Sequence, residues 1–146
     1  MRRAIALALV AGLAACGSRD VPVASLEVAV PGAFSAALSP DGRQAVVGSL
    51  RHGGSLWDLE TDQRRFDWNH RAGAFTPITA VAVAPGGEAA ITAEHDTLVL
   101  WDTASGEAIT YFTAPAKVNA IALGPGGRFA LLGLSEANVR QRLSRA

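Results

Sequence analysis

Short apolar stretches separated by polar or glycine-rich turns follow one another along most of this 146-residue chain. The stretches are five or six residues long, and within each successive pair they begin about ten residues apart. This pattern is typical of β-strands joined by tight turns, because a helix would need a longer apolar pattern with a 3.6-residue period. It predicts strands at residues 34–38, 44–48, 79–83, 88–93, 118–123 and 128–133.

A third strand is predicted after the first pair and after the second pair, and each ends in the dipeptide Trp-Asp. These dipeptides are Trp57-Asp58 and Trp101-Asp102. A fourth strand follows each of them, at 64–70 and 108–114, and residues 21–30 supply a similar stretch ahead of the first group. The sequence therefore predicts an all-β fold made of four-stranded antiparallel sheets.

The stretches recur as three aligned copies, at residues 33–63, 78–107 and 118–146. Each copy has a turn between its first two strands, where proline fixes one backbone angle and glycine supplies the positive φ of the next corner. The turn prolines lie 45 and 40 residues apart, a period found in propeller blades and solenoid units. The turn residues that this pattern singles out are Pro40, Asp41, Gly42, Pro85, Gly87, Pro125 and Gly127.

The two Trp-Asp pairs, the Ser-Pro-Asp-Gly turn at 39–42 and the period together resemble the WD40 family of β-propellers. The resemblance implies an open, incomplete propeller of two blades and a partial third, with repeats at about 25–63, 64–107 and 108–136. It also implies a buried hydrogen-bonded set in each blade, formed by a His, an Asp, a Ser or Thr, and the Trp. In the second copy the matching residues are His70, Thr92 and Trp101, with either His95 or Asp96.

The third copy departs from the other two near its end. A Trp-Asp pair is expected near residues 141–143, where the sequence reads Gln-Arg-Leu, and residues 137–146 form a divergent basic tail. One interpretation is an N-terminal fragment of a longer propeller, and the other is a divergent last strand that caps the sheet. Propellers close with 4–8 blades. We therefore expect open blade faces, covered by self-association or by other chains.

The first residues have the features of an export signal at 1–15. Two arginines precede twelve small or apolar residues, too short a run to cross a ~30 Å hydrocarbon core. The sequence Leu-Ala-Ala-Cys that ends at Cys16 is similar to the lipobox of bacterial lipoproteins. That resemblance implies acylation of Cys16, a lipid-anchored tether at 16–24 and an outer-membrane location facing the periplasm. The alternative is a plain signal peptide with an incidental cysteine.

Charge and chemistry narrow the possible functions. Without the first fifteen and last seven residues, 8 basic residues stand against 13 acidic ones, a poor match for nucleic acid. Only three histidines are present, without metal-binding spacing, and no cofactor site is predicted. His95 and Asp96 are expected not to pair as a catalytic dyad, because adjacent residues of an extended chain point to opposite faces. Trp68 and Tyr111, in the outermost strands, either cover a blade edge or contact a partner.

These features predict a lipid-anchored WD40-like propeller in the cell envelope that acts as a scaffold for protein–protein interactions and is not an enzyme. The architecture is similar to that of propeller lipoproteins that assist outer-membrane barrel assembly, although fold alone does not establish function. Two alternatives stay open. The chain is part of a periplasmic propeller enzyme, acting with a quinone or on glycans, or it is a truncated product without a function of its own.

Overall fold

The structure, a computed structural model, describes residues 25, 27, 28 and 32–135. The expected signal at 1–15, the acylated Cys16, its tether at 16–24 and the basic tail at 137–146 lie outside the described residues. Within the described part of the chain, no helix is long and apolar enough to cross a membrane.

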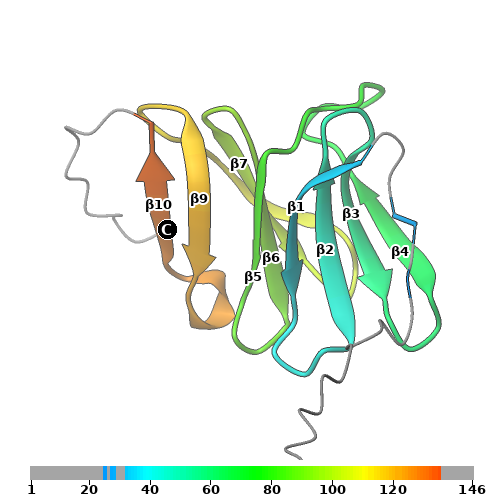
Figure 1. The fold of residues 1–146 in the computed structure, drawn as a ribbon. Helices are drawn as coiled ribbons and strands as arrows, with labels where there is room; N and C mark the ends of the chain where they lie inside the picture. Colours follow the sequence, from blue (N-terminus) through cyan, green and yellow to red (C-terminus); the bar gives the residue numbers. More distant parts are fainter. Residues whose placement is uncertain (1–24, 26, 29–31, 136–146) are drawn as a thin grey trace, which may run out of the picture.

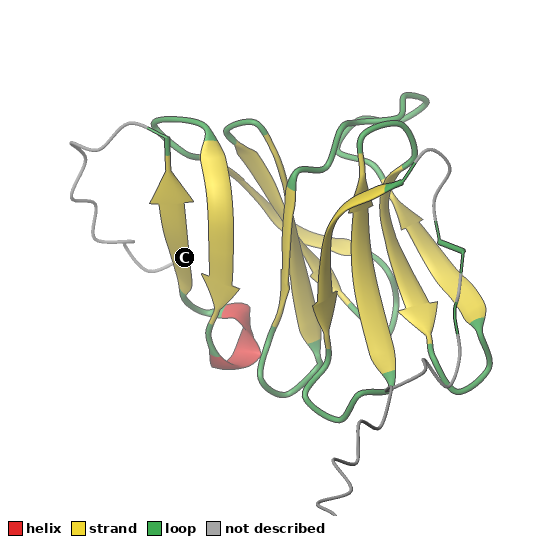
Figure 2. Ribbon diagram, viewed as in Figure 1, coloured by secondary structure: helices red, strands yellow, loops and turns green. Residues whose placement is uncertain are grey.

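Two four-stranded antiparallel sheets and a two-stranded one stand side by side (Figures 1 and 2). The first sheet contains β1 (Ala33–Leu38), β2 (Gln44–Ser49), β3 (Gly53–Asp58) and β4 (Gln63–Trp68), in that order. The second contains β5 (Ala80–Val83), β6 (Ala89–Glu94), β7 (Thr97–Asp102) and β8 (Ala108–Thr113). The third pairs β9 (Val118–Leu123) with β10 (Ala130–Leu134), and the turn between them contains the 3₁₀ segment η1 (Pro125–Gly127).

The prediction of an all-β fold of four-stranded antiparallel sheets is confirmed. The predicted strands after the Pro-Gly turns and the Trp-Asp pairs match the observed ones to within two residues at each end. The stretch at 21–30 is different. Only Ser25, Glu27 and Val28 are described there, and none of the three lies in a strand, although Val28 packs against the cluster formed by Ala45, Val47 and Trp57.

The second sheet is buried on both of its faces. The core that it shares with the first sheet contains Val46, Leu56, Trp68, Ile78, Val81, Ala90, Val99 and Trp101. The core that it shares with the third contains Ala80, Ala82, Ala84, Ala89, Ile91, Ala93, Leu98, Leu100, Ala114, Val118 and Leu123. Neighbours such as Val99 and Leu100 belong to different cores because successive side chains of a strand point to opposite faces. The sheets are thus stacked as successive blades.

The predicted Pro-Gly turns all lie at one end of the stack. Each is closed by a backbone hydrogen bond to the carbonyl three residues earlier, which Gly42 donates to Ser39 (2.9 Å), Gly87 to Ala84 (2.8 Å) and Gly127 to Gly124 (3.2 Å). Gly42 and Gly87 have φ values of 71° and 79°, the left-handed conformation that favours glycine. The three turns thus lie at one common end of the sheets, and the connection from β4 to β5 lies at the other end.

Candidate functional site

A hydrogen-bonded set connects the first and second sheets. His70 follows β4 of the first sheet, and its Nε2 lies 2.8 Å from Oγ1 of Thr92 on β6. Nε1–H of Trp101, on β7, donates to the same hydroxyl oxygen over 2.8 Å. Thr92 is fully buried and Trp101 is 6% exposed. The structure therefore brings His70, Thr92 and Trp101 together around one hydroxyl group.

The shared hydroxyl is compatible with either neutral tautomer of His70. Thr92 Oγ1 accepts from Trp101, and it can donate its own proton to Nε2 of His70 or accept a second hydrogen bond from it. The other ring nitrogen, Nδ1, lies 4.0 Å from Oε2 of Glu94. Glu94 in turn accepts a hydrogen bond of 3.0 Å from Arg71. The hydrogen bonds from Trp101 thus end at the His70 ring, and the ion pair of Glu94 with Arg71 lies beyond it at the edge of the junction.

The acidic member of the set differs from the expectation. The carboxylate beside His70 belongs to Glu94, whereas Asp96 Oδ1 lies 3.4 Å from Nδ1 of His95. The two side chains lie closer together than in an extended chain, because His95 has a φ of 54° in the turn between β6 and β7. Their side chains are 69% and 43% exposed, so this pair lies at the surface.

Burial keeps His70 neutral. Its side chain is 1% exposed, and loss of hydration lowers its pKa from 6.5 to about 4, with a smaller contribution from the positive charge of Arg71. Glu94 lies at 4.0 Å and favours the charged ring, but its charge is shared with Arg71. Loss of hydration therefore affects the pKa of His70 more than the charge of Glu94 does.

In the first sheet a different residue accepts the hydrogen bond of the indole N–H. Nε1–H of Trp57 donates to Oγ of Ser55, two residues earlier on β3, over 2.8 Å. Val47 stands opposite Ser55, at the position that corresponds to Thr92, which stands opposite Val99. The hydroxyl group of the first sheet is therefore on the third strand, whereas that of the second sheet is on the second strand, at the same level. Ser55 was not predicted because the expected position of the hydroxyl is on the second strand of the sheet.

The two outer-strand aromatics have different roles. Trp68 is 1% exposed, and its Nε1–H donates to the carbonyl oxygen of Gly106 in the second sheet over 3.0 Å. Trp68 therefore joins two blades, in addition to covering the edge of its own sheet. Tyr111, on β8, is 59% exposed.

The aspartates of the two Trp-Asp pairs hold turns. Asp58 Oδ1 accepts backbone hydrogen bonds from Glu60 (3.0 Å) and Thr61 (3.1 Å). Asp102 Oδ1 accepts them from Ala104 (2.9 Å) and Ser105 (2.7 Å). These backbone donors lower the pKa of both carboxyl groups. Both charges are thus used to cap a turn.

Asp41 has the same role in the turn between β1 and β2. Its Oδ1 accepts a hydrogen bond of 2.6 Å from Oγ of Ser39 and one of 3.1 Å from the amide of Arg43. The hydroxyl of Ser39 is the larger cause of a lowered pKa. Of the predicted turn prolines, Pro40, Pro85 and Pro125 are all exposed at this end.

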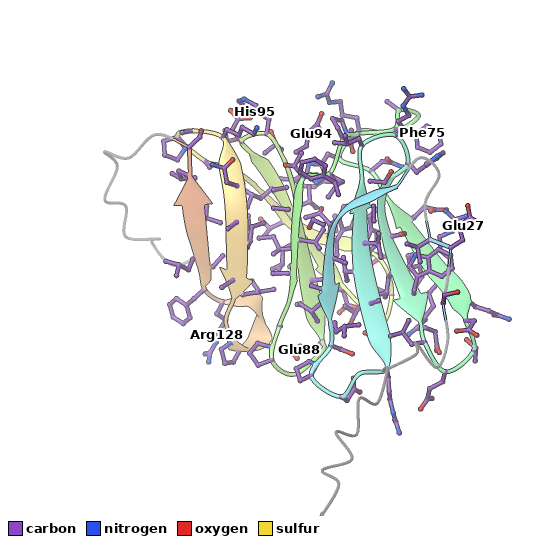
Figure 3. The ribbon with its side chains drawn as sticks, viewed as in Figure 1. Glu27, Phe75, Glu88, Glu94, His95 and Arg128 are labelled. Atoms are coloured by element: carbon purple, nitrogen blue, oxygen red, sulfur yellow. The ribbon has the colours of Figure 1, made fainter. Side chains whose placement is uncertain are left out.

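The opposite end of the stack carries an exposed aromatic side chain on an ordered connection. Phe75, between β4 and β5, is 68% exposed, and the ring of His52 lies edge-on to it with centroids 5.7 Å apart. The connection is held by Thr76, which is 2% exposed; its Oγ1 accepts from the amide of His70, and its amide donates to Asn69 Oδ1. Figure 3 shows Phe75, Glu94 and His95 at this same end.

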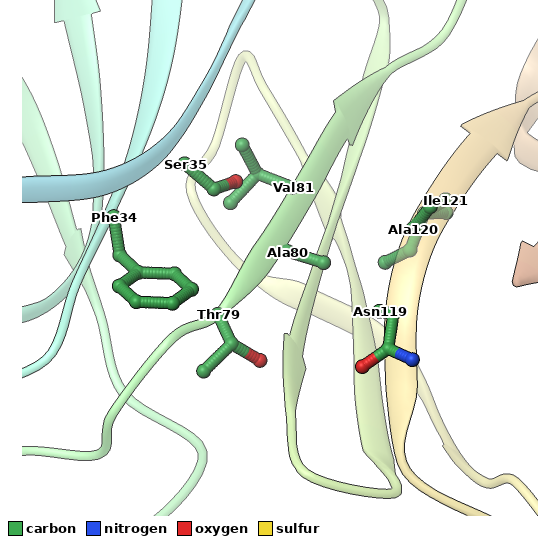
Figure 4. Close-up of a pocket in the computed structure, with 8 residues that line it drawn as sticks. All are labelled: Phe34, Ser35, Thr79, Ala80, Val81, Asn119, Ala120 and Ile121. Atoms are coloured by element: carbon green, nitrogen blue, oxygen red, sulfur yellow. The ribbon is translucent and has the colours of Figure 1, made fainter. Parts of the chain in front are cut away.

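A hollow of about 330 Å³ lies where the innermost strands β1, β5 and β9 come together (Figure 4). Its lining combines apolar side chains with two hydroxyl groups and one carboxamide. The lining residues are Phe34, Ser35, Thr79, Ala80, Val81, Asn119, Ala120 and Ile121. Each of them is uncharged, so a ligand here would be held by shape and neutral hydrogen bonds. Among the described residues, no group of three or more His, Cys, Asp or Glu side chains could hold a metal ion.

No protein-family model matches the sequence, and no curated protein matches it significantly. The fold is similar to that of the hydrazine synthase of Kuenenia stuttgartiensis, with a TM-score of 0.62 and 19% identity over 79% of this chain. It is also similar to the β-propeller domain of Cps50 (Swd1) of Myceliophteria thermophila (0.60, 20%, 70% of this chain) and to the WD40 repeats of RRP9 (0.55, 16%, 64%). The chain has the fold of WD40-like propeller blades.

The chain spans about a third of each of these structures, with 32%, 32% and 28% of their lengths covered in the same order. At this level of identity the likeness concerns the fold. The described sheets amount to two complete blades and half of a third, and they form an open arrangement.

Proposed function

We propose that this chain is a lipid-anchored scaffold of the bacterial cell envelope, which binds other proteins through its propeller blades. The observation that carries the proposal is the exposed ring of Phe75 at the end of the stack opposite the Pro-Gly turns. There an aromatic side chain is 68% exposed on a connection whose backbone is fixed by hydrogen bonds to Thr76. Rigid, exposed aromatics are frequent anchors of protein interfaces, because little entropy is lost when they bind.

A binding role without catalysis fits the lining of the inner strands. The side chains around the hollow offer hydroxyl, amide and apolar groups, whereas general acid–base catalysis requires titratable groups within reach of a substrate. The carboxylates at the turn end are engaged by backbone amides, as Asp58 and Asp102 illustrate. These features favour the scaffold over the enzyme as the proposal.

The binding proposal is tested by placing a photo-crosslinking phenylalanine analogue at position 75 in living cells. Position 104, exposed in the turn between β7 and β8, serves as the matched control at the other end. The expected result is a discrete adduct with another protein from position 75 and none from position 104. Equal labelling from both positions, or none from either, would contradict a docking role for this end.

The anchor is tested separately with Cys16→Ser. Wild-type protein should incorporate an alkyne-tagged palmitate analogue and sediment with membranes, because stable anchoring needs more than one acyl chain. The variant should lose the label and move to the soluble fraction. Retention in the membrane fraction without the label would show that something other than a lipid holds the protein there, and the lipoprotein part of the proposal would be abandoned.

A second copy of the chain is the partner that we propose for the side of the third sheet, at β10, on which no other described strand lies. Leu131 on β10 is 76% exposed, and Phe129 just before this strand is 57% exposed. Apolar side chains at the edge of a sheet favour pairing with another chain. Self-association through this side leaves the end with Phe75 available for other partners.

A further inference from the structure

The junction between the first two sheets contains an unpaired buried polar atom. Of the described side chains, only His70 and Gln44 have a buried nitrogen or oxygen without a hydrogen-bond partner, and in His70 this atom is Nδ1. Its ring belongs to the segment after β4 but bonds to Thr92 of the next sheet. Buried polar groups are normally satisfied, so a single unpaired one at a junction requires an explanation.

The charged groups around the ring come from two elements. Glu94, at the end of β6, has its Oε2 4.0 Å from Nδ1, and Arg71, next in the chain, binds Glu94 over 3.0 Å. From β7 the ring meets the indole of Trp101, with centroids 6.5 Å apart. The ring therefore lies beside a neutral indole and an ion pair, and the nearest carboxylate, that of Glu94, is held more closely by Arg71.

We propose that this junction is an acid-operated latch, in which neutral His70 holds the first sheet against the second and protonated His70 releases it. The latch is a conformational property of the blades and does not depend on the scaffold proposal.

Protonation changes the hydrogen bonding at Nε2. In the imidazolium both ring nitrogens carry a proton, so Nε2 can only donate to the hydroxyl of Thr92. The hydroxyl must then accept from both the imidazolium and Trp101, and its own proton is left without an acceptor inside a fully buried residue. A buried unsatisfied donor and a buried cation both destabilise the closed junction.

Release of His70 affects a whole segment. Trp68 bonds to Gly106, His70 to Thr92 and Arg71 to Glu94, so three contacts between the sheets come from the four consecutive positions 68–71. Opening would expose the ring of Trp68, which now stacks on Trp101. The surface uncovered is aromatic and apolar, which is the kind of surface that engages partners.

The size of the effect follows from proton linkage. The pKa of His70 is about 4 in the closed state, because of burial and then Arg71, and 6.5 is the ordinary value expected once the ring is hydrated. A histidine with a lowered pKa stabilises the closed form above pH 6.5, and this contribution is lost as the pH falls toward 4. The opening equilibrium should therefore rise roughly 30-fold between pH 7.5 and pH 5.

Hydrogen exchange of the indole N–H groups in the full chain tests the latch. Trp68 and Trp101 donate across or within the junction, whereas Trp57 donates to Ser55 inside the first sheet and serves as an internal control. Corrected for intrinsic rates, the protection of Trp68 and Trp101 should fall about 30-fold from pH 7.5 to pH 5, with that of Trp57 unchanged. His70→Gln, which keeps a neutral polar group near Nε2, should abolish the fall, and the surface variant His95→Gln should not.

Two results would overturn the proposal. One is an equal loss of protection at all three indoles, which would mean global unfolding; the other is a loss that persists in His70→Gln. If that variant does not fold, the titration of the His70 ring by NMR in the wild-type chain decides the matter. A midpoint near 4 that coincides with the loss of indole protection at Trp68 supports the latch, and a midpoint near 6.5, or a titration without that loss, contradicts it.

Discussion

The indole of Trp68, on the outer strand of the first sheet, stacks on the indole of Trp101 in the second, with ring centroids 5.2 Å apart and planes inclined by 8°. Phe66 extends the stack on the other side of Trp68, at 6.5 Å. The contact joins an outer strand of one blade to the Trp-Asp strand of the next. It makes the two blades one unit and predicts that they unfold together.

Trp68→Ala should lower the free energy of unfolding by about 3–5 kcal/mol, because it leaves a cavity between two sheets. Trp68→Phe keeps most of the ring and removes the hydrogen bond to Gly106, so its cost should be smaller. Urea denaturation followed by circular dichroism measures both values. A cost for Trp68→Ala below that of Trp68→Phe would show that the stacked ring does not join the blades.

Thr92→Val should lower the free energy of unfolding by about 1–3 kcal/mol, because it leaves the indole N–H of Trp101 buried without an acceptor. Thr92→Ser keeps the hydroxyl and should cost less. Chemical denaturation of the two variants gives the comparison. A larger loss for Thr92→Ser than for Thr92→Val would mean that the methyl group contributes more than the hydroxyl.

The hydroxyl group that Trp57 binds in the first sheet can be moved to the opposite strand by two substitutions. Ser55→Val should destabilise the chain because Trp57 loses its acceptor, and adding Val47→Thr on the opposite strand should recover part of the loss. The pair stands where Val99 and Thr92 stand in the second sheet. The measurement is a double-mutant cycle by denaturation. Strict additivity of the two substitutions would refute the equivalence of the two hydroxyl positions.

Two glycines with nearly equal φ angles should differ in how much their replacement by alanine lowers the stability of the chain. Gly73 has a φ of 73° and open space where a Cβ would lie, whereas a Cβ at Gly106, with a φ of 77°, would lie 2.5 Å from a ring carbon of Phe66. Gly73→Ala should cost about 1 kcal/mol for the backbone alone. Gly106→Ala should cost a further 1–3 kcal/mol or so from the clash beneath the aromatic stack. Thermal unfolding of both variants tests this order.

The turn carboxylates predict a second, more acidic pH dependence. Hydrogen bonds from Ser105 and Ala104 lower the pKa of Asp102 below its usual 3.8, so the unfolded chain takes up a proton before the folded one does. This contribution to stability is complete above pH 3.8 and is lost as the pH falls through the folded pKa. Asp102→Asn keeps an acceptor oxygen and should flatten the fall of the unfolding free energy below pH 4. An unchanged slope in denaturation curves would exclude this role.

The strands and turns could be predicted from the sequence because they depend on local signals. Pro40 and Pro85 with their glycines mark the turns, and the short apolar stretches between them have the length of strands. The set around Thr92 was found through its likeness to a known repeat. Glu94, Ser55 and the burial of Trp68 were missed because they depend on which strand faces which, and on how one blade meets the next. Neither property is encoded in the spacing of residues along one strand.

The β10 side of the third sheet should control the oligomeric state. Leu131 is 76% exposed on β10, a strand that pairs with β9 and with no other described strand. A charge on such an edge blocks pairing with another chain, so Leu131→Glu should weaken self-association by about tenfold or more, equivalent to ~1.4 kcal/mol. Ile109→Glu is the matched control, because Ile109 is 54% exposed on β8, at the edge of the second sheet. Analytical ultracentrifugation over a range of concentrations measures both variants. A wild-type chain that stays monomeric throughout, or two variants that dissociate alike, would show that β10 is not the self-association surface.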